Sequence, residues 1–336
     1  MKKRLLIKTL AAAMALTAFG IAAAQDIKER TLKVGLQNPK GHPAVMGAEK
    51  FAEIVAAKSG GKIKVNLFPG GVLGGDAPTV SALQGGTVEM TVLNSGILAS
   101  QVKEFAIYDF PFLFASAKEA DSVVDGPFGK GLHAKLADKG IIGLAYWELG
   151  FRDLTNGKRP INKVEDIAGL KLRVIPNPIN IDWVKALDAN PTPLAFPELY
   201  AALEQKAVDG QENPVSVILA NKFGEVQKYL TLTHHQYNPQ SVIMSKKVWD
   251  TMSPAEKKII QDAADEAGRY QRQVSRDQAA STIDQLKKAG MQVTELPPAE
   301  MAKLQLKMKP VIDKHAASVG ETTVKDVMAE LAKLRK

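Results

Sequence analysis

The 336-residue chain contains no cysteine, and aromatic residues make up 6% of it. Without cysteine there can be no disulfide, no thiolate metal site and no cysteine nucleophile. The lysine and arginine residues are dispersed, and with so few aromatic side chains they do not indicate a nucleic-acid-binding module. No short repeat or low-complexity segment is visible. The chain is long enough to form two lobes of ordinary size.

An apolar run lies near the N-terminus, from about Leu10 to Ala23, after four basic residues, and it ends in Ala22-Ala23-Ala24. This pattern is typical of a secretory signal peptide with a small-residue cleavage site. The run falls short of the ~20 residues that span a bilayer, although an uncleaved anchor is the alternative. We therefore expect residues 1–24 to be removed near Ala24, leaving an exported protein that does not insert into a membrane. Loss of the four basic residues reduces the net charge from +8 to +4, which fits slight attraction for small anions.

Strands and helices alternate along the first part of the remaining chain. Apolar periodicity predicts strands at 31–37, 62–68 and 89–93, with helices at 44–58 and from 78 to 83. This order predicts parallel strands covered by helices, with a ligand at the carboxyl ends of the strands. The polar residues expected at or just past that edge are Gln37, Asn38, Asp76, Asn94 and Ser95. The alternative for Asp76 is that it caps the next helix.

A second α/β unit follows. Strands are predicted at 141–147, 172–175 and 208–211, a helical turn at 166–170, and helices at 180–187 and 197–206. Two α/β lobes that face each other are therefore expected, with a pocket at their interface. We assign residues 25–150 and about 236–278 to the first lobe, and residues 151–235 and about 279–336 to the second.

A long helix is predicted near the C-terminal end. Ser253-Pro-Ala-Glu256 is a capping box, and the helical pattern continues to Gly290. A helix of about 36 residues would be about 54 Å long at ~1.5 Å per residue, which exceeds the length of one lobe. We interpret it as a brace or hinge element that spans both lobes. An oligomerisation arm is the alternative, although the apolar stripe lacks clean heptads.

Two short segments point to chemistry. Leu170–Val174 places a cation, Arg173, in an apolar strand, and a buried guanidinium is costly without a planar anionic partner. Asp209–Pro214 is a tight turn that carries an acid, a proline and the amide of Asn213. Together they predict an arginine clamp for a carboxylate and an amide that reads the rest of the ligand. The alternative is that Arg173 pairs with a neighbouring acid, Glu165 or Asp166.

The sequence gives weaker evidence for a catalytic site than for a binding site. His234 and His235 are adjacent, so they do not share a helical face, and no glutamate-containing zinc motif surrounds them. The chain has no Gly-x-Ser-x-Gly elbow, and the glycine pairs around Leu73 lack the ending of a phosphate loop. An exported hydrolase is the alternative from a different class, whereas a structural partner protein would not need Arg173 beside a polar strand edge.

Several motifs occur in a distinctive order over essentially the whole exported chain. They are Asp109–Leu113, Gly150–Pro160, Asp166–Val174, Pro191–Tyr200, Ala207–Pro214 and Phe223–Leu232. In order and spacing they resemble the solute-binding proteins of tripartite ATP-independent periplasmic (TRAP) transporters. The resemblance implies a two-lobed periplasmic-binding-protein fold that closes on an organic acid and delivers it to the two-part membrane transporter. It implies a periplasmic location and calls for no cofactor and no metal, although some relatives recruit a cation beside the substrate.

The resemblance also implies roles for individual residues. Arg173 matches the carboxylate-binding arginine of the family, Asn213 its asparagine, and Phe196 the residue that packs against the ligand. Arg152 matches a second arginine that approaches the ligand in many members. In the first lobe the resemblance points to Gln37 or Asn38, Asp76 and Asn94. The structural alternatives are a lobe-junction role for Arg152, a turn role for Asn213 and a core role for Phe196.

The predicted ligand is a sugar acid, a uronate or aldonate. The amides of Gln37, Asn38 and Asn94 suit hydroxyl groups better than a second carboxylate. Arg152 argues the other way, because a second cation could hold a second acid, so a C4-dicarboxylate or another small carboxylate is the alternative. The partners expected from the resemblance are the organic acid and the membrane subunits of a TRAP transporter.

Overall fold

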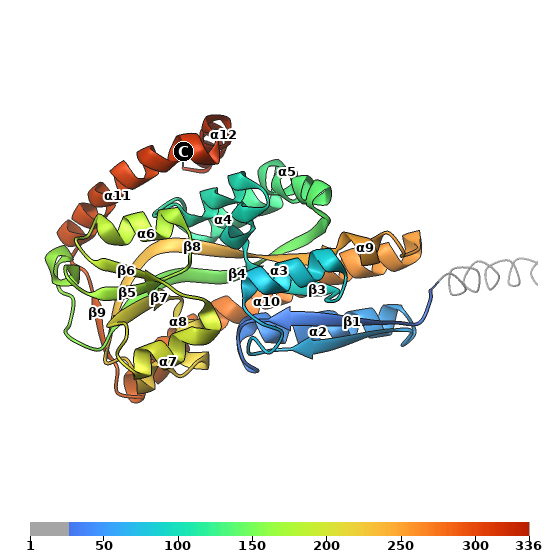
Figure 1. Ribbon diagram of the computed structural model, residues 1–336, viewed down its shortest axis with the longest axis horizontal. Helices are drawn as coiled ribbons and strands as arrows, with labels where there is room; N and C mark the ends of the chain where they lie inside the picture. The colour runs from blue at the N-terminus through green and yellow to red at the C-terminus, as the bar shows by residue number, and fades with distance from the viewer. Residues whose placement is uncertain (1–26, 336) are drawn as a thin grey trace, which may run out of the picture.

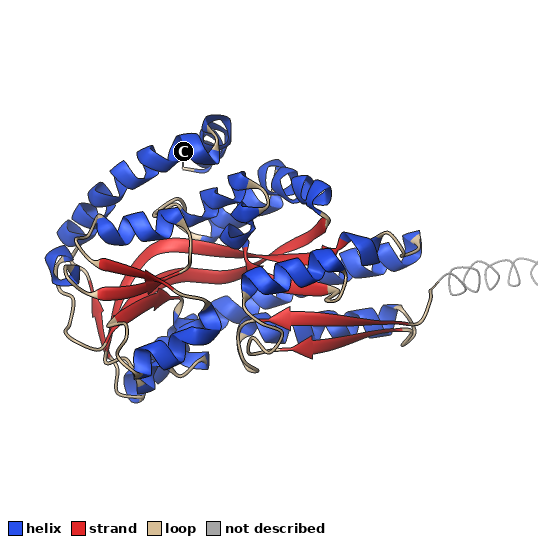
Figure 2. Cartoon of the chain, in the orientation of Figure 1, coloured by secondary structure: helices blue, strands red, loops and turns tan. Residues whose placement is uncertain are grey.

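The computed structural model describes residues 27–335, so the predicted signal peptide lies outside the described residues (Figures 1 and 2). A mixed sheet of nine strands forms the centre of the molecule, in the order β2-β1-β3-β8-β4-β7-β5-β6, with β9 paired to β8. The strands are β1 (Arg30–Leu36), β2 (Ile63–Phe68), β3 (Met90–Asn94), β4 (Ile141–Asn156), β5 (Lys171–Val174), β6 (Asn190–Pro193), β7 (Gly210–Asn213), β8 (Tyr229–Ser245) and β9 (Gln292–Glu295).

Helices cover both faces of the sheet. In the view of Figure 1, α4, α5, α6, α11 and α12 lie above the long strands β4 and β8, and the C-terminus lies beside α12. The α-helices are α2 (Pro43–Lys58), α3 (Asp76–Gly85), α4 (Ala117–Asp125), α5 (Pro127–Lys135), α6 (Pro178–Lys185), α7 (Leu199–Glu204), α8 (Val215–Ala220), α9 (Lys246–Trp249), α10 (Pro254–Lys288), α11 (Pro298–Val319) and α12 (Glu321–Leu334). Among residues 27–335 no helix is both long and apolar enough to cross a membrane.

The first lobe is built on β1, β2 and β3. As the alternating pattern predicts, β1 is parallel to both of its neighbours. Apolar residues of β1, β3, β4, α2 and α10 form one buried cluster against these strands, which includes Val34, Phe51 and Trp147. The carboxyl ends of β1 and β3 therefore lie at the same edge of the sheet, where the polar residues after them were expected.

The second lobe is built on β5, β6 and β7, again with parallel pairing of β5 to both neighbours. Two long antiparallel strands, β4 and β8, pair with each other along most of their length and connect the lobes. β4 pairs with β7 in the second lobe, while β8 pairs with β3 in the first. The predicted lobe boundaries at residues 150 and 235 thus fall inside β4 and β8. This is the two-lobed α/β fold that the sequence predicts.

The predicted long helix is present as α10, a helix of 35 residues that begins with the capping box of Ser253 and Glu256. It packs against α2 and β4 in the first lobe and against α8 in the second. Two glycines permit the close approach: a Cβ at Gly268 would lie 2.9 Å from the Trp147 ring, and one at Gly47 would lie 2.7 Å from Gln271. The helix therefore spans both lobes, as predicted.

Candidate functional site

A cavity of about 610 Å³ lies between the two lobes. Its walls come from the carboxyl ends of β1 and β3, the start of α3, the ends of β5 and β7, and the segment before α7. All eight residues predicted from the sequence line this one cavity: Gln37, Asn38, Asp76, Asn94, Arg152, Arg173, Phe196 and Asn213. The structure therefore brings together side chains that are up to 176 positions apart in the sequence, from Gln37 to Asn213.

Arg173 points a nearly unpartnered guanidinium into this cavity. The residue is 2% exposed, and its Nε donates to the carbonyl oxygen of Leu194 at 2.9 Å. Within residues 27–335 this side chain has no other hydrogen bond and no ion pair. Burial lowers the pKa of Arg173 to about 10, against the opposing charge of Glu212, so the side chain stays charged at neutral pH. The guanidinium also lies 5.8 Å from the centroid of the Phe196 ring, within range of a cation–π contact.

The neighbouring acids are engaged elsewhere. Asp166 accepts hydrogen bonds from the backbone of Asn162 and Lys163, at 2.9 and 3.1 Å, and so closes the turn before β5. Glu165 forms an ion pair with Lys303 on α11. The pairing of Arg173 with either acid, which the sequence left open, is therefore absent from the structure.

Arg152, on β4, is placed differently. Its guanidinium contacts both carboxylate oxygens of Glu212 and the carbonyl oxygen of the same residue, and it donates to Asn238 Oδ1 at 2.8 Å. Burial alone would raise the pKa of Glu212, but Arg152 and the His235 ring, whose Nε2 lies 3.4 Å from Glu212 Oε2, outweigh it and lower the pKa to about 2. Arg152 thus lines the cavity as half of a buried ion pair.

Asn213 and Phe196 occupy the second-lobe wall. Asn213 ends β7, and its Nδ2 donates to Gln211 Oε1 at 2.6 Å. Phe196 is partly buried and packs against the cluster around α7 and α8, with its ring centroid 6.3 Å from that of Phe223. Phe196 therefore both fills the edge of the core and contributes an apolar surface to the cavity.

Two first-lobe side chains bring buried acceptors to the cavity. Asp76 is the first residue of α3, whose N-cap is Gly75, and it forms no cap hydrogen bond. Its Oδ1 is buried without a partner among the described residues. Burial raises the pKa of Asp76 to about 6, although Arg173 pulls it downward. Gln37 donates from Nε2 to the Gly74 carbonyl at 3.0 Å, which leaves its Oε1 buried and equally without a partner.

The other two first-lobe amides are held by protein groups. Asn94 accepts from the backbone of Gly96 at 3.1 Å and donates to Asn238 at 3.0 Å. Asn38 accepts at Oδ1 from Asn221 of the second lobe, at 3.1 Å. Asn94 therefore has both ends of its amide engaged, whereas the amino group of Asn38 has no partner in the described chain.

Sequence reasoning missed several cavity residues. Asn177 and Gln240 line the cavity, and Glu212 and Asn238 hold Arg152 from behind. Glu212 lies inside the motif Asp209–Pro214, next to Asn213. An acid at that position of the motif was the signal that could have indicated a buried partner for an arginine. Asn238 lies on β8, which the sequence pattern did not reveal.

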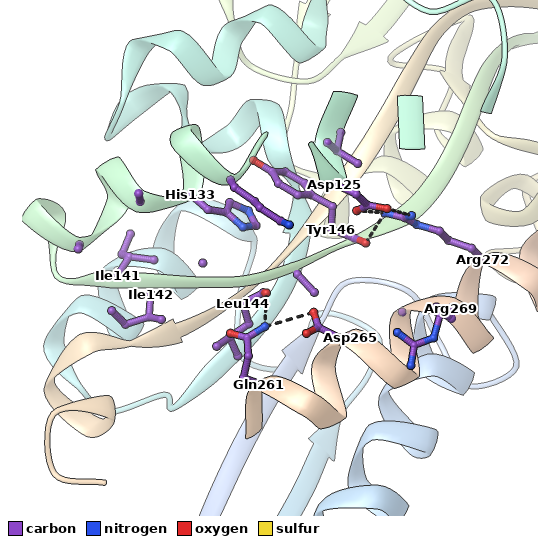
Figure 3. A pocket seen from close by; sticks show the side chains of 17 residues that line it. Asp125, His133, Ile141, Ile142, Leu144, Tyr146, Gln261, Asp265, Arg269 and Arg272 are labelled. Carbon is purple, nitrogen blue, oxygen red and sulfur yellow. Dashed lines mark hydrogen bonds and ion pairs between the residues drawn. The ribbon is translucent and has the colours of Figure 1, made fainter. Parts of the chain in front are cut away.

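A second cavity, of about 630 Å³, lies on the first lobe between α5, β4 and α10 (Figure 3). It contains none of the eight predicted residues. Side chains of α10 donate to the exposed edge of β4: Gln261 to the carbonyl of Leu144 at 2.8 Å, and Arg272 to that of Tyr146 at 2.7 Å. Arg272 also pairs with Asp125 on α4. These contacts attach α10 and α4 to the sheet, so the polar side chains that line this cavity have structural roles.

Comparison with known proteins agrees with this arrangement. The family described as bacterial extracellular solute-binding protein, family 7 (DctP) matches residues 34–318. The 2,3-diketo-L-gulonate-binding periplasmic protein YiaO of Escherichia coli is 37% identical over 276 residues, 82% of this chain and 84% of that protein.

Two solved structures extend the similarity. A TRAP periplasmic solute-binding protein from Ochrobactrum anthropi, with a C-terminus bound in its ligand-binding pocket, is 58% identical with a TM-score of 0.82, over 92% of this chain and 97% of that one. The sugar-acid-binding protein DctPAm of Advenella mimigardefordensis, in complex with galactonate, is 42% identical with a TM-score of 0.90, over 92% and 99% of the two chains. This chain therefore belongs to family 7 of the bacterial extracellular solute-binding proteins, the DctP family of TRAP periplasmic solute-binding proteins.

Proposed function

We propose that this protein binds a hydroxylated monocarboxylate, a sugar acid such as an aldonate or uronate, and delivers it to the membrane subunits of a TRAP transporter. The observation that carries the proposal is that one cavity contains both a cation without a counterion and buried hydrogen-bond acceptors without donors. Arg173 offers the cation, while Asp76 Oδ1 and Gln37 Oε1 are acceptors without donors. A sugar acid supplies a carboxylate for the first and hydroxyl donors for the second.

The carboxylate binds at Arg173. A guanidinium presents a planar fork that forms two parallel hydrogen bonds to a carboxylate. A buried, unpaired charge is costly, and a ligand carboxylate removes that cost by taking the place of water. Phe196, 5.8 Å from the guanidinium, provides an apolar surface beside the bound group.

A second carboxylate has no comparable place in this cavity. The cations that line it are Arg152 and Arg173, and the charge of Arg152 is already balanced by Glu212. Asp76 would repel a second carboxylate across the cavity. A C4-dicarboxylate without hydroxyl groups, such as succinate, offers acceptors at both ends and cannot donate to Gln37 or Asp76, so the site favours the sugar acid. Binding of galactonate by DctPAm, which is 42% identical, supports the same ligand class.

Isothermal titration with three matched acids tests the proposal: galactonate, hexanoate and succinate. Galactonate and hexanoate share one carboxylate and six carbons but differ in hydroxyl groups, while succinate carries a second carboxylate. We expect galactonate to bind at least tenfold more tightly than either of the others, because unpaired buried polar groups penalise the wrong ligand. Tighter binding of succinate would contradict the proposal.

We also propose that the protein is a binder and does not transform its ligand. Galactonate incubated with the protein should be recovered unchanged, as followed by proton NMR over several hours. Conversion to any product would show that the protein is an enzyme and would contradict the proposal. Binding should increase the free energy of unfolding by RT ln(1 + [L]/Kd), where [L] is the free ligand concentration, and should raise the melting temperature accordingly.

A further inference from the structure

Asn221 forms a hydrogen bond across the interface between the lobes. It is the C-cap residue of α8 in the second lobe, and its Nδ2 donates to Asn38 Oδ1 of the first lobe at 3.1 Å. The same Nδ2 donates to the carbonyl oxygen of Val217 at 2.9 Å. Because a backbone carbonyl can only accept, the contact with Val217 requires that Asn221 present its amino group here.

The orientation of Asn221 determines that of Asn38. An amino group needs an acceptor, so the atom of Asn38 that faces Asn221 is its carbonyl oxygen. The amino group of Asn38 then lies on the other side of the amide. Asn38 lines the interlobe cavity, and its amino group has no partner within residues 27–335. The amide thus offers hydrogen-bond donors to a ligand, in a cavity where Gln37 and Asp76 offer acceptors.

The rest of Asn38 is held within the first lobe. Its carbonyl oxygen accepts from the backbone of Gly70 at 2.9 Å, which ties the loop before α3 to the end of β1. Close by, a Cβ added to Gly71 would lie 3.3 Å from the side chain of Pro197. The two lobes therefore touch at this loop, and the bond from Asn221 to Asn38 belongs to the closed arrangement.

We propose that Asn221 is a positioning residue that fixes the Asn38 amide as a donor toward the ligand when the lobes close. The proposal rests on the binding function proposed above. In an open molecule Asn38 has no partner from the second lobe, so its amide rotates freely and presents either end to the cavity. Closure selects the donor end, so ligand recognition by Asn38 and lobe closure favour each other. Asn221 acts through Asn38 and does not itself line the cavity.

A double-mutant cycle tests this with galactonate as the ligand. Asn221→Ala removes the hydrogen bond between the lobes, together with the local bond to Val217, and no longer orients the Asn38 amide, so we expect about three- to tenfold weaker binding, mainly through faster dissociation. In an Asn38→Ala background the same substitution should have almost no further effect. Asn221→Asp should weaken binding more than Asn221→Ala, because an ionised carboxylate accepts only and turns the carbonyl oxygen of Asn38 toward the ligand.

Asn190→Ala is the matched control. Asn190 is an exposed second-lobe residue whose Nδ2 donates to the Gly169 carbonyl at 3.2 Å, and it does not line the cavity. Its substitution should leave galactonate affinity unchanged. The melting temperature of each unliganded variant separates effects on folding from effects on binding.

The outcomes are distinct. Losses in affinity that simply add in the Asn38→Ala/Asn221→Ala variant, with wild-type protein still binding galactonate, would overturn the positioning role and leave the proposed function intact. Equal losses for Asn221→Ala and Asn221→Asp would overturn the assigned amide orientation. If the wild-type protein binds no organic acid, the proposed function fails and this inference fails with it.

Discussion

Arg152 and Glu212 form a bidentate ion pair in the wall of the interlobe cavity, with both side chains about 1% exposed. The second arginine of the site is therefore neutralised by the protein before any ligand arrives. Its pairing separates the two arginines by role: Arg152 holds β4 to β7, while Arg173 is left with capacity for an external carboxylate.

Substitution of Glu212 tests this separation. Glu212→Gln leaves the charge of Arg152 buried without a counterion, so we expect the free energy of unfolding to fall by about 3–5 kcal/mol. Urea denaturation followed by circular dichroism measures the change. Asp313→Asn is the control, because it breaks an exposed pair with Lys309 on α11 and should change stability by less than about 0.5 kcal/mol. A similar small effect at Glu212 would show that Arg152 does not depend on it.

Arg173→Lys tests the carboxylate clamp. A lysine keeps the positive charge but loses the planar fork, so galactonate should bind at least about tenfold more weakly while the fold is retained. Titration calorimetry gives the affinity, and far-ultraviolet circular dichroism checks the fold. Lys309→Arg, a charge-conserving change at an exposed site, should leave the affinity as it is. Unchanged affinity in Arg173→Lys would remove Arg173 from the binding role.

Asp76 should make stability depend on pH. The usual pKa of an aspartate is 3.8, and burial raises that of folded Asp76 to about 6. The folded protein therefore holds a proton that the unfolded chain has released, and stability declines as the pH rises from about 4 to 6 and stays lower above that. Asp76→Asn removes this penalty. We expect its melting temperature to exceed that of the wild type at pH 7 and to equal it near pH 4.

The same variant should bind less well. An asparagine can still accept a hydrogen bond, but it loses the charge that strengthens the bond from a ligand hydroxyl. Galactonate affinity at pH 7 should fall about tenfold, while hexanoate affinity should not fall. A gain in stability without a loss in galactonate affinity would mean that Asp76 does not read the ligand.

Gly71→Ala separates backbone strain from lobe contact. Gly71 has φ +71°, and an added Cβ would lie 3.2 Å from Gln37 Oε1 and 3.3 Å from Pro197. Gly61→Ala is the matched control, with φ +79° and nothing within 4 Å. Both variants should lose about 1 kcal/mol of stability because alanine disfavours positive φ. Only Gly71→Ala should weaken galactonate binding, since only it crowds the closed interface; equal affinities would argue against closure at this loop.

The sequence predicted the elements whose side chains alternate simply and missed those that break the rule. β1 and β2 were recognisable because apolar residues repeat with period two, and β3 was recognisable as a short segment that stops at Asn94. β8 was not, because buried polar residues such as Thr231, Gln236 and Asn238 interrupt its pattern, and their partners lie on other elements. β6 contains Pro191 and Pro193, which are tolerated because it is an edge strand.

The candidate site shows the same division. The eight predicted residues that line the cavity could be named because each lies at or past the end of a predicted strand or falls in a family motif. Their contacts could not, since Glu212 lies 60 positions from Arg152, and Asn221 lies 183 positions from Asn38. The first contact depends on the pairing of β4 with β7 and the second on how the lobes meet, and both are properties of the folded chain. The binding roles of these residues remain predictions for the experiments above.

The continuity of β4 and β8 bears on cooperativity. Both strands are shared between the lobes, since β8 pairs with β3 in the first lobe and β4 pairs with β7 in the second. Unfolding of one lobe would therefore break backbone hydrogen bonds that the other lobe needs. We therefore expect the two lobes to unfold together, as one cooperative unit. Its calorimetric unfolding should therefore appear as one transition whose van't Hoff enthalpy equals the calorimetric enthalpy.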